Sequence, residues 1–154
     1  MLRLPTWQVV RYAVALSMLL GLGSARAAAD LNAKAIRVQL PADIKWTKGN
    51  GSESSVLVGD PSKPGLYVVL QKWLPHNNSH PHFHQNDRFI NVISGTWWVN
   101  TGAKYDPQGM RPVPAGSFVT HFGKEIHYDG ARDAECILEI VGMGPATATQ
   151  AEEK

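Results

Sequence analysis

Hydrophobic and polar residues alternate over short distances in the chain after residue 30. Runs rich in Val, Ile, Tyr and Trp recur there, and none of them keeps a helical period over a useful length. Alternation with period two places successive side chains on opposite faces of a strand. We therefore expect strands over 36–40, 55–59, 66–74, 88–95, 96–101, 117–121 and 135–142.

Turn-forming residues separate these runs. Gly, Pro, Asn and Asp gather at 49–51, 60–65, 106–109 and 114–116. Evenly spaced short strands with such turns predict an all-β sandwich or barrel. The sequence has no internal repeat and no linker long enough to divide two domains, so we expect one domain over residues 30–145. The polar tail over 146–154 is expected to lack fixed structure.

The leader before residue 30 has the organisation of a cleaved signal peptide. Arg3 and Arg11 supply positive charge, and the apolar run at 12–23 is too short to span a bilayer comfortably. Small residues then predict cleavage after Ala27 or, as a second choice, after Ala29. We expect a periplasmic or secreted mature protein with no membrane contact after cleavage. The alternative is an uncleaved N-terminal anchor.

The charge balance changes once the leader is removed. The full chain has 15 Lys and Arg residues and 13 Asp and Glu residues. Loss of the arginines at 3, 11 and 26 leaves twelve basic against thirteen acidic residues, a net charge of −1. This balance argues against a nucleic-acid partner and against a polybasic membrane-binding surface.

The single cysteine, Cys136, excludes an internal disulfide bond. The mature chain must therefore be held by its core, for which about 125 residues suffice. Cys136 shares one face of its expected strand with Leu138 and Ile140, so we expect a buried structural thiol and not a nucleophile.

All six histidines lie between His76 and His127, which suggests a shared site. On a strand, His80, His82 and His84 project to one face. Two neutral imidazoles two residues apart can bind one divalent ion, with further ligands from another strand. From these three histidines alone, a solvated patch that binds metals adventitiously is a comparable interpretation.

The spacing around these histidines resembles the first motif of the cupin superfamily. That motif is His-x-His, three or four residues, Glu, six residues, Gly. Here His82-x-His84 is followed by three residues, Arg88, six residues and Gly95. An arginine therefore stands where the family has its glutamate.

The family's second motif has a counterpart as well. The pattern is Gly, five residues, Pro-x-Gly, two residues, His, and here Gly116 is followed by five residues, Phe122-Gly123-Lys124, two residues and His127. Phe122 and Lys124 replace the family's Pro and second Gly. The similarity covers roughly residues 59–145, and Gly-Thr-Trp-Trp-Val and Pro-Ala-Gly-Ser-Phe within it also resemble small single-domain bacterial cupins.

The resemblance implies a single-domain jelly-roll barrel, also called a double-stranded β-helix, with a metal-binding mouth. Carried over by motif position, the ligands of one divalent transition metal would be His82, His84 and His127. A competing set uses His80, His82 and Asp87. His121 is an alternative to His127, and we expect it to lie in the cavity or behind the ligands.

Without a glutamate ligand, a divalent ion would keep its full charge and three open positions. Such a centre favours an anionic chelating ligand, for example an enolate, a catecholate or a hydroxy-acid. Arg88 has the strand parity of His82 and His84, so an unbroken strand directs it inward, where it would act as a catalytic anion-binding residue. The alternative is a bulge that turns Arg88 to the surface beside Asp87.

Three functions fit these expectations. Three-histidine centres occur among cupin dioxygenases, so the resemblance suggests a metal-dependent oxygenase or oxidoreductase acting on a small anionic or enolisable molecule. The alternatives are a non-catalytic cupin that binds or senses a metal or small ligand, and a metal-dependent isomerase or lyase. A histidine-only site accepts Fe, Mn, Ni, Cu or Zn. Strand pairing through 36–40 would allow a homodimer.

Overall fold

The computed structural model describes residues 31–154. The chain divides into two compact units, Met1–Ile44 and Lys45–Lys154. The predicted signal peptide and its cleavage sites lie outside the described residues. Within these residues, no helix is long and apolar enough to cross a membrane.

The described part of the first unit contains one short 3-10 helix, η1 (Pro41–Asp43). The strand predicted over 36–40 is wrong, because those residues adopt no strand conformation. Ile36 and Val38 are 54% and 42% exposed. An alternating pattern forms a strand only where a neighbouring strand completes its backbone hydrogen bonds, and no strand pairs with these residues in the described chain.

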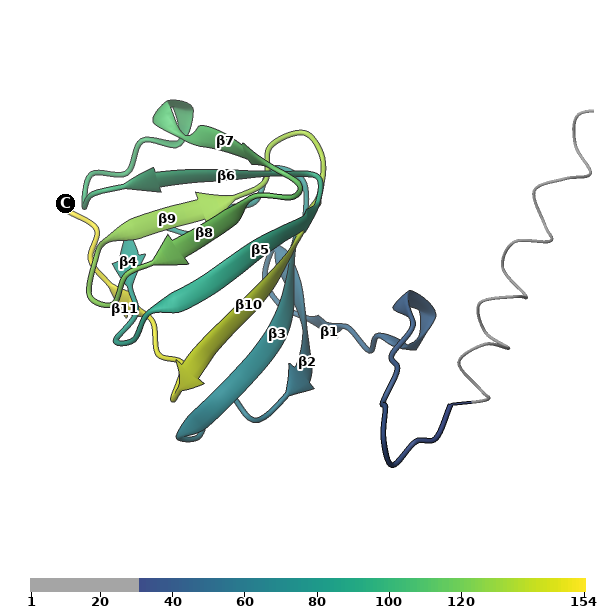
Figure 1. Cartoon of the computed structure of the whole chain (residues 1–154). Helices are drawn as coiled ribbons and strands as arrows, with labels where there is room; N and C mark the ends of the chain where they lie inside the picture. The colour runs from purple at the N-terminus through teal and green to yellow at the C-terminus, as the bar shows by residue number, and fades with distance from the viewer. Residues whose placement is uncertain (1–30) are drawn as a thin grey trace, which may run out of the picture. The chain divides into compact units, whose positions relative to one another are not determined.

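The second unit consists of two antiparallel sheets (Figure 1). The six-stranded sheet has the order β1-β2-β3-β10-β5-β8, with bounds β1 (Thr47–Lys48), β2 (Ser52–Val58), β3 (Gly65–Trp73), β10 (Cys136–Gly144), β5 (Arg88–Ser94) and β8 (Phe118–His121). The five-stranded sheet has the order β11-β4-β9-β6-β7, with bounds β11 (Thr149–Gln150), β4 (His82–Phe83), β9 (His127–Gly130), β6 (Thr96–Thr101) and β7 (Arg111–Pro114). A 3-10 turn, η2 (Pro107–Gly109), precedes β7.

The all-β prediction is confirmed, and six of the seven predicted strands correspond to β2, β3, β5, β6, β8 and β10. The prediction missed β7, whose Pro112 and Pro114 weaken the strand signal. Proline is tolerated there because β7 is an edge strand of its sheet.

The inward faces of the two sheets form the hydrophobic core. β10 contributes Cys136, Leu138 and Ile140, and Trp97 on β6 is fully buried among them. Cys136 is 0% exposed, and burial raises the pKa of its thiol to about 12. A thiol with that pKa stays protonated at neutral pH and is a poor nucleophile, which fits the structural role expected for it.

The expectation that residues 146–154 lack fixed structure is wrong. Within them, β11 pairs antiparallel with β4, and Thr149 lies opposite Phe83. The error has a physical cause: the edge of β4 offers backbone hydrogen bonds, which a polar segment can satisfy as well as an apolar one. We call residues 147–153 the strap.

Candidate metal centre

Three of the predicted ligands lie together at one end of the space between the sheets. His82 on β4 is paired in register with His127 on β9, and His84 follows β4 directly. One nitrogen from each ring lies within 4.8 Å of the others. The three side chains are only 5–8% exposed, so they form a recessed cluster.

Backbone carbonyls orient all three rings. The Nδ1 atoms of His82, His84 and His127 lie 2.8 Å, 2.6 Å and 3.0 Å from the carbonyl oxygens of His80, Thr147 and Glu125, in that order. A carbonyl oxygen only accepts, so each Nδ1 carries the proton and donates it. Each Nε2 is therefore left with a lone pair, as a metal ligand requires.

The Nε2 atoms of His82 and His84 are 3.1 Å apart. With both Nδ1 atoms protonated, two lone pairs face each other at this distance, which is unfavourable unless a cation lies between them. Two imidazole nitrogens each ~2.1 Å from one ion and at a right angle would be about 3.0 Å apart. The geometry therefore fits a shared metal ion.

Burial keeps these ligands in the neutral form that binds metals. It lowers the pKa of His84 to about 3, with a further contribution from the positive charge of Arg88. It lowers the pKa of His127 to about 4, against the opposing effect of Asp129. Neither ring has to lose a proton before it can bind an ion at neutral pH.

Arg88 faces the same space. It begins β5 opposite His121 of β8, and its Nη2 lies 3.1 Å from Nδ1 of His121 and 3.5 Å from Nε2 of His127. Its Nε is buried without a hydrogen-bond partner in the described chain. The surface alternative beside Asp87 is wrong, because the Arg88 guanidinium contacts the buried His121 and His127 and no hydrogen bond or ion pair joins it to Asp87 among the described residues. The exposed Asp87 carboxylate accepts a hydrogen bond from the backbone N–H of Gly123 at 2.7 Å.

The other candidate ligands do not join the cluster. His80 is exposed, stacks on Tyr105 with ring centroids 4.3 Å apart, and pairs with Glu152 at 2.8 Å. Asp87 is exposed as well, so the structure does not assemble the set of His80, His82 and Asp87.

His121 occupies the cavity position expected for it. Its ring is 8% exposed and lies 3.8 Å, centroid to centroid, from that of His127. Burial lowers its pKa to about 3. Its Nδ1 accepts a hydrogen bond from Arg88, so His121 helps to hold the guanidinium in place beside the ligand cluster.

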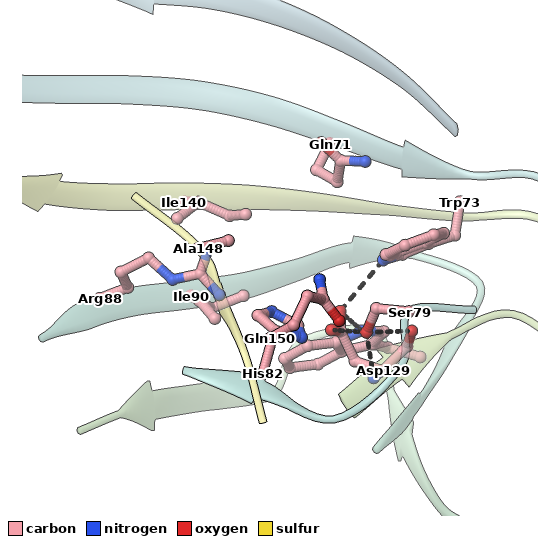
Figure 2. Close-up of a pocket in the computed structure, with 11 residues that line it drawn as sticks. Gln71, Trp73, Ser79, His82, Arg88, Ile90, Asp129, Ile140, Ala148 and Gln150 are labelled. Carbon is pink, nitrogen blue, oxygen red and sulfur yellow. Dashed lines mark hydrogen bonds between the residues drawn. The ribbon is translucent and has the colours of Figure 1, made fainter. Parts of the chain in front are cut away.

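A cavity of about 250 Å³ adjoins the cluster (Figure 2). Polar and aromatic side chains from both sheets line it, together with residues of the strap. The lining consists of Gln71, Trp73, Ser79, His82, Arg88, Ile90, Trp97, Asp129, Ile140, Ala148 and Gln150.

Asp129 is the cavity residue that the sequence analysis missed. Its carboxylate is 6% exposed and accepts hydrogen bonds from Nε1 of Trp73 at 3.1 Å, Nε1 of Trp97 at 2.9 Å and Oγ of Ser79 at 3.1 Å. Burial acts to raise its pKa, but the neighbouring His121 and Arg88 outweigh burial and hold the pKa below its usual value. Its parity with His127, two residues earlier on β9, was the available signal.

Comparison with known proteins identifies the fold. The sequence matches no protein-family model, and a search of curated proteins found no match. The polyketide cyclase RemF from Streptomyces resistomycificus superposes with a TM-score of 0.63 and 16% identity over 77% of this chain and 87% of its own. A sugar phosphate isomerase of the cupin superfamily from Silicibacter pomeroyi superposes with a TM-score of 0.58 and 23% identity over 75% and 83%.

A third similar structure carries the name of the architecture itself. It is a conserved protein with a double-stranded β-helix domain from Klebsiella pneumoniae, with a TM-score of 0.58 and 18% identity over 77% of this chain and 99% of its own. At these identities the likeness concerns the fold and not the activity. The chain therefore has the double-stranded β-helix fold of the cupin superfamily, as its two motifs predicted.

Proposed function

We propose that this protein is a metal-dependent cupin enzyme that binds a small anionic or enolisable molecule at a centre held by His82, His84 and His127. One observation carries the proposal: the Nδ1 atoms of all three rings lie within hydrogen-bond distance of backbone carbonyls, which leaves each Nε2 with a lone pair, and one ring nitrogen of each histidine lies within 4.8 Å of the others. A lone solvated histidine patch would not need this orientation. A bound divalent ion would supply Lewis-acid or redox chemistry there.

The charges around the centre favour an anionic ligand. Three neutral imidazoles leave the charge of a divalent ion uncompensated, and the guanidinium of Arg88 adds another positive charge beside it. Among the described residues, Asp129 is the only carboxylate that lines the cavity, and its hydrogen bonds with two indoles and a hydroxyl occupy most of its acceptor capacity. Its single negative charge offsets that of Arg88, so a divalent ion would still leave the site with an excess of positive charge. A ligand carboxylate or enolate would balance this excess and would give the buried Nε of Arg88 an acceptor.

The reaction we favour is oxidation of the bound anion with O₂ as the oxidant. In this reaction Arg88 would hold the anionic group, and His121 would hold Arg88. Trp73 and Trp97 would exclude water from the far wall of the cavity.

Isomerase or lyase chemistry is the second candidate. The solved structures with a similar fold include a polyketide cyclase and a sugar phosphate isomerase, and both names describe reactions without net oxidation. Because fold alone does not fix activity, the two candidates have to be separated by O₂ consumption. A non-catalytic binding protein would show neither O₂ uptake nor product.

The proposed location is the periplasm or the extracellular space, after cleavage behind Ala27 or Ala29. The intact mass of protein recovered from the periplasm tests it. A mass that begins at Ala28 or Asp30 supports export, whereas a mass that retains Met1 supports the anchor.

Elemental analysis of protein taken from its own compartment tests the centre. We expect about one transition metal ion per chain, and loss of most of it after His82→Ala, His84→Ala or His127→Ala. His80→Ala is the matched control, because His80 lies outside the cluster and should leave the metal content unchanged. Equal metal content in all four variants would contradict the proposed centre.

Activity is then screened on the metal-loaded protein with a set of enolisable carboxylates. O₂ uptake matched to substrate loss supports oxygenation. Substrate loss without O₂ uptake supports the isomerase or lyase, and binding without turnover supports the non-catalytic alternative.

A further inference from the structure

We infer that the strap, residues 147–153, is a working part of the metal centre: the backbone of Thr147 positions His84, and the side chain of Gln150 contacts the ligand in the cavity. The inference rests on the proposed metal centre and deepens it. Its residues are the ones that composition alone had assigned to an unstructured tail.

The first observation is the orientation of His84. Its Nδ1 donates to the carbonyl oxygen of Thr147 at 2.6 Å, across 63 residues of sequence. The corresponding acceptors for His82 and His127 are carbonyls only two residues earlier in the chain. His84 lies just after the end of β4, so its ring depends on a distant segment for its orientation.

The second observation is the course of the strap over the cavity. β11 pairs with β4 so that Gln150 lies opposite the ligand His82. Ala148 and Gln150 are part of the cavity lining, and Figure 2 shows the strap as a strand running past His82 with the Gln150 side chain directed into the pocket. A molecule bound beside His82 would meet the Gln150 amide, which can donate and accept hydrogen bonds.

The third observation is how the strap is fastened. The backbone N–H groups of Ala151 and Glu153 donate to the carbonyls of Pro81 and Ala103 at 2.9 Å and 3.0 Å. An exposed ion pair between Glu152 and His80 adds a contact at 2.8 Å. An exposed pair contributes little stability, so β11 and the backbone hydrogen bonds carry most of the attachment.

Two shortened chains separate orientation from fastening. A chain ending at Ala146 loses the carbonyl that orients His84, while a chain ending at Gln150 keeps that carbonyl and β11 but loses the later contacts. We expect the Co²⁺ affinity of the first to fall about 10- to 100-fold, as for loss of a partner that orients a metal-bound histidine. The visible spectrum of the Co²⁺ complex of the chain ending at Ala146 should also change. The Co²⁺ affinity of the chain ending at Gln150 should stay within about threefold of that of the full chain.

These outcomes distinguish the inference from the proposal beneath it. A full chain that does not bind Co²⁺ stoichiometrically contradicts the metal centre itself. If the full chain and the chain ending at Ala146 bind Co²⁺ with equal affinity, the metal centre is supported. The proposed role of Thr147 is then wrong.

A measurement on the full chain covers the case in which the chain ending at Ala146 does not fold, as judged by circular dichroism. Nitrogen-15 NMR of the metal-free protein reports which ring nitrogen of His84 carries the proton. The proton should lie on Nδ1 and exchange slowly, because it is donated to Thr147. A proton on Nε2 overturns the inference.

Gln150→Ala tests the contact with ligand. With Co²⁺-loaded protein and glycolate as the probe anion, we expect glycolate affinity to fall roughly two- to tenfold, as for loss of one neutral hydrogen bond. Co²⁺ affinity should not change. Gln85→Ala, at an exposed position outside the cavity lining, is the matched control. Unchanged glycolate affinity in Gln150→Ala would assign Gln150 to the wall alone.

Discussion

At the scale of single residues, Arg88 decides the character of the site. The cupin motif places a glutamate ligand at this position, and a carboxylate there would cancel one charge of a bound ion. The arginine instead lies beside His127 and His121, and its buried Nε has no hydrogen-bond partner among the described residues. In the proposed centre, a bound ion would keep its positive charge, and the site would select its ligand by charge.

Substitution of Arg88 should therefore separate metal binding from anion binding. Arg88→Ala should retain the metal and weaken glycolate binding roughly ten- to a hundredfold, because a charge-assisted hydrogen bond contributes about 1.5–3 kcal/mol. Arg88→Glu should tighten metal binding and suppress anion binding, since it adds a ligand and removes a charge. Calorimetric titration measures both.

Arg111→Ala is the control for these variants, because Arg111 is exposed on β7. It should match the unmodified protein in both titrations. Unchanged metal and glycolate affinities in Arg88→Glu would contradict the proposal that Arg88 faces the bound metal and anion.

The buried histidines also predict how the metal-free protein responds to acid. The folded-state pKa values of His84 and His121 are about 3 and that of His127 is about 4, each lowered by burial from an ordinary value of 6.5. The unfolded chain therefore binds more protons than the folded chain below pH 6.5. Stability should be greatest above pH 6.5 and fall as the pH drops toward 4, by up to ~1.4 kcal/mol per pH unit for each histidine.

Urea unfolding of chelator-treated protein at pH 7.5 and at pH 5 measures this effect. His121→Phe is the matched comparison, because it removes one titrating ring and should make the dependence on pH shallower. A free energy of unfolding that is the same at both values would show that these rings are not buried in the neutral form.

At the scale of elements, the two sheets are joined through Asp129. Trp73 lies on β3 of the six-stranded sheet and Trp97 on β6 of the five-stranded sheet, and both indoles donate to Oδ2 of Asp129 on β9. Trp73→Phe should lower the free energy of unfolding by about 1.5–3 kcal/mol, because a hydrogen bond to a charged group is lost.

Trp98→Phe is the control for that substitution. The guanidinium carbon of Arg132 lies 3.7 Å from the centroid of the Trp98 ring. The described donors to Oδ2 of Asp129 are the indoles of Trp73 and Trp97. Equal losses of stability in the two variants would show that the lost packing, and not the hydrogen bond, accounts for the effect of Trp73→Phe.

The turn between β5 and β6 depends on the glycine of the first motif. Gly95 has a φ of +74°, and a Cβ there would lie 2.3 Å from the carbonyl oxygen of Glu135. Gly95→Ala should lower the free energy of unfolding by more than about 1 kcal/mol, since neither the backbone conformation nor the space suits a side chain. Denaturant unfolding measures the change.

Gly102→Ala provides the comparison for Gly95. Gly102 has a φ of +92°, but in the described part of the chain no atom lies within 4 Å of a Cβ added there. Its substitution carries the conformational cost alone and should be milder. Equal decreases in the free energy of unfolding of Gly95→Ala and Gly102→Ala would contradict a steric clash at Gly95.

At the scale of the whole molecule, the homodimer stays a prediction. Its expected contact, a strand over 36–40, is not formed in the described structure. Exposed apolar side chains on the outer face of the six-stranded sheet, such as Phe89 on β5 and Phe118 on β8, offer another contact surface for the predicted dimer. Light scattering at high protein concentration measures the mass, and a monomer would contradict the prediction.

The sequence by itself determined the fold class and most of the strands, because period-two alternation is a local property of an extended backbone. The inward direction of Arg88 was one of two interpretations, and it assumed an unbroken strand from His82 to Arg88. The structure instead ends β4 at Phe83 and begins β5 at Arg88 in the other sheet, so the inward position of Arg88 comes from the tertiary structure. The position of Gly95 followed from the resemblance to the first cupin motif and its fixed spacing.

Only the tertiary structure decided which groups complete the site. The pairing of β4 with β9 brings His127 to His82, the pairing of β4 with β11 brings Thr147 to His84, and Asp129 finds its indole donors on two different sheets. These contacts join residues far apart in the chain, and the strap is held through its backbone. Backbone hydrogen bonds form with almost any sequence, so hydrophobic patterning carries no signal of them.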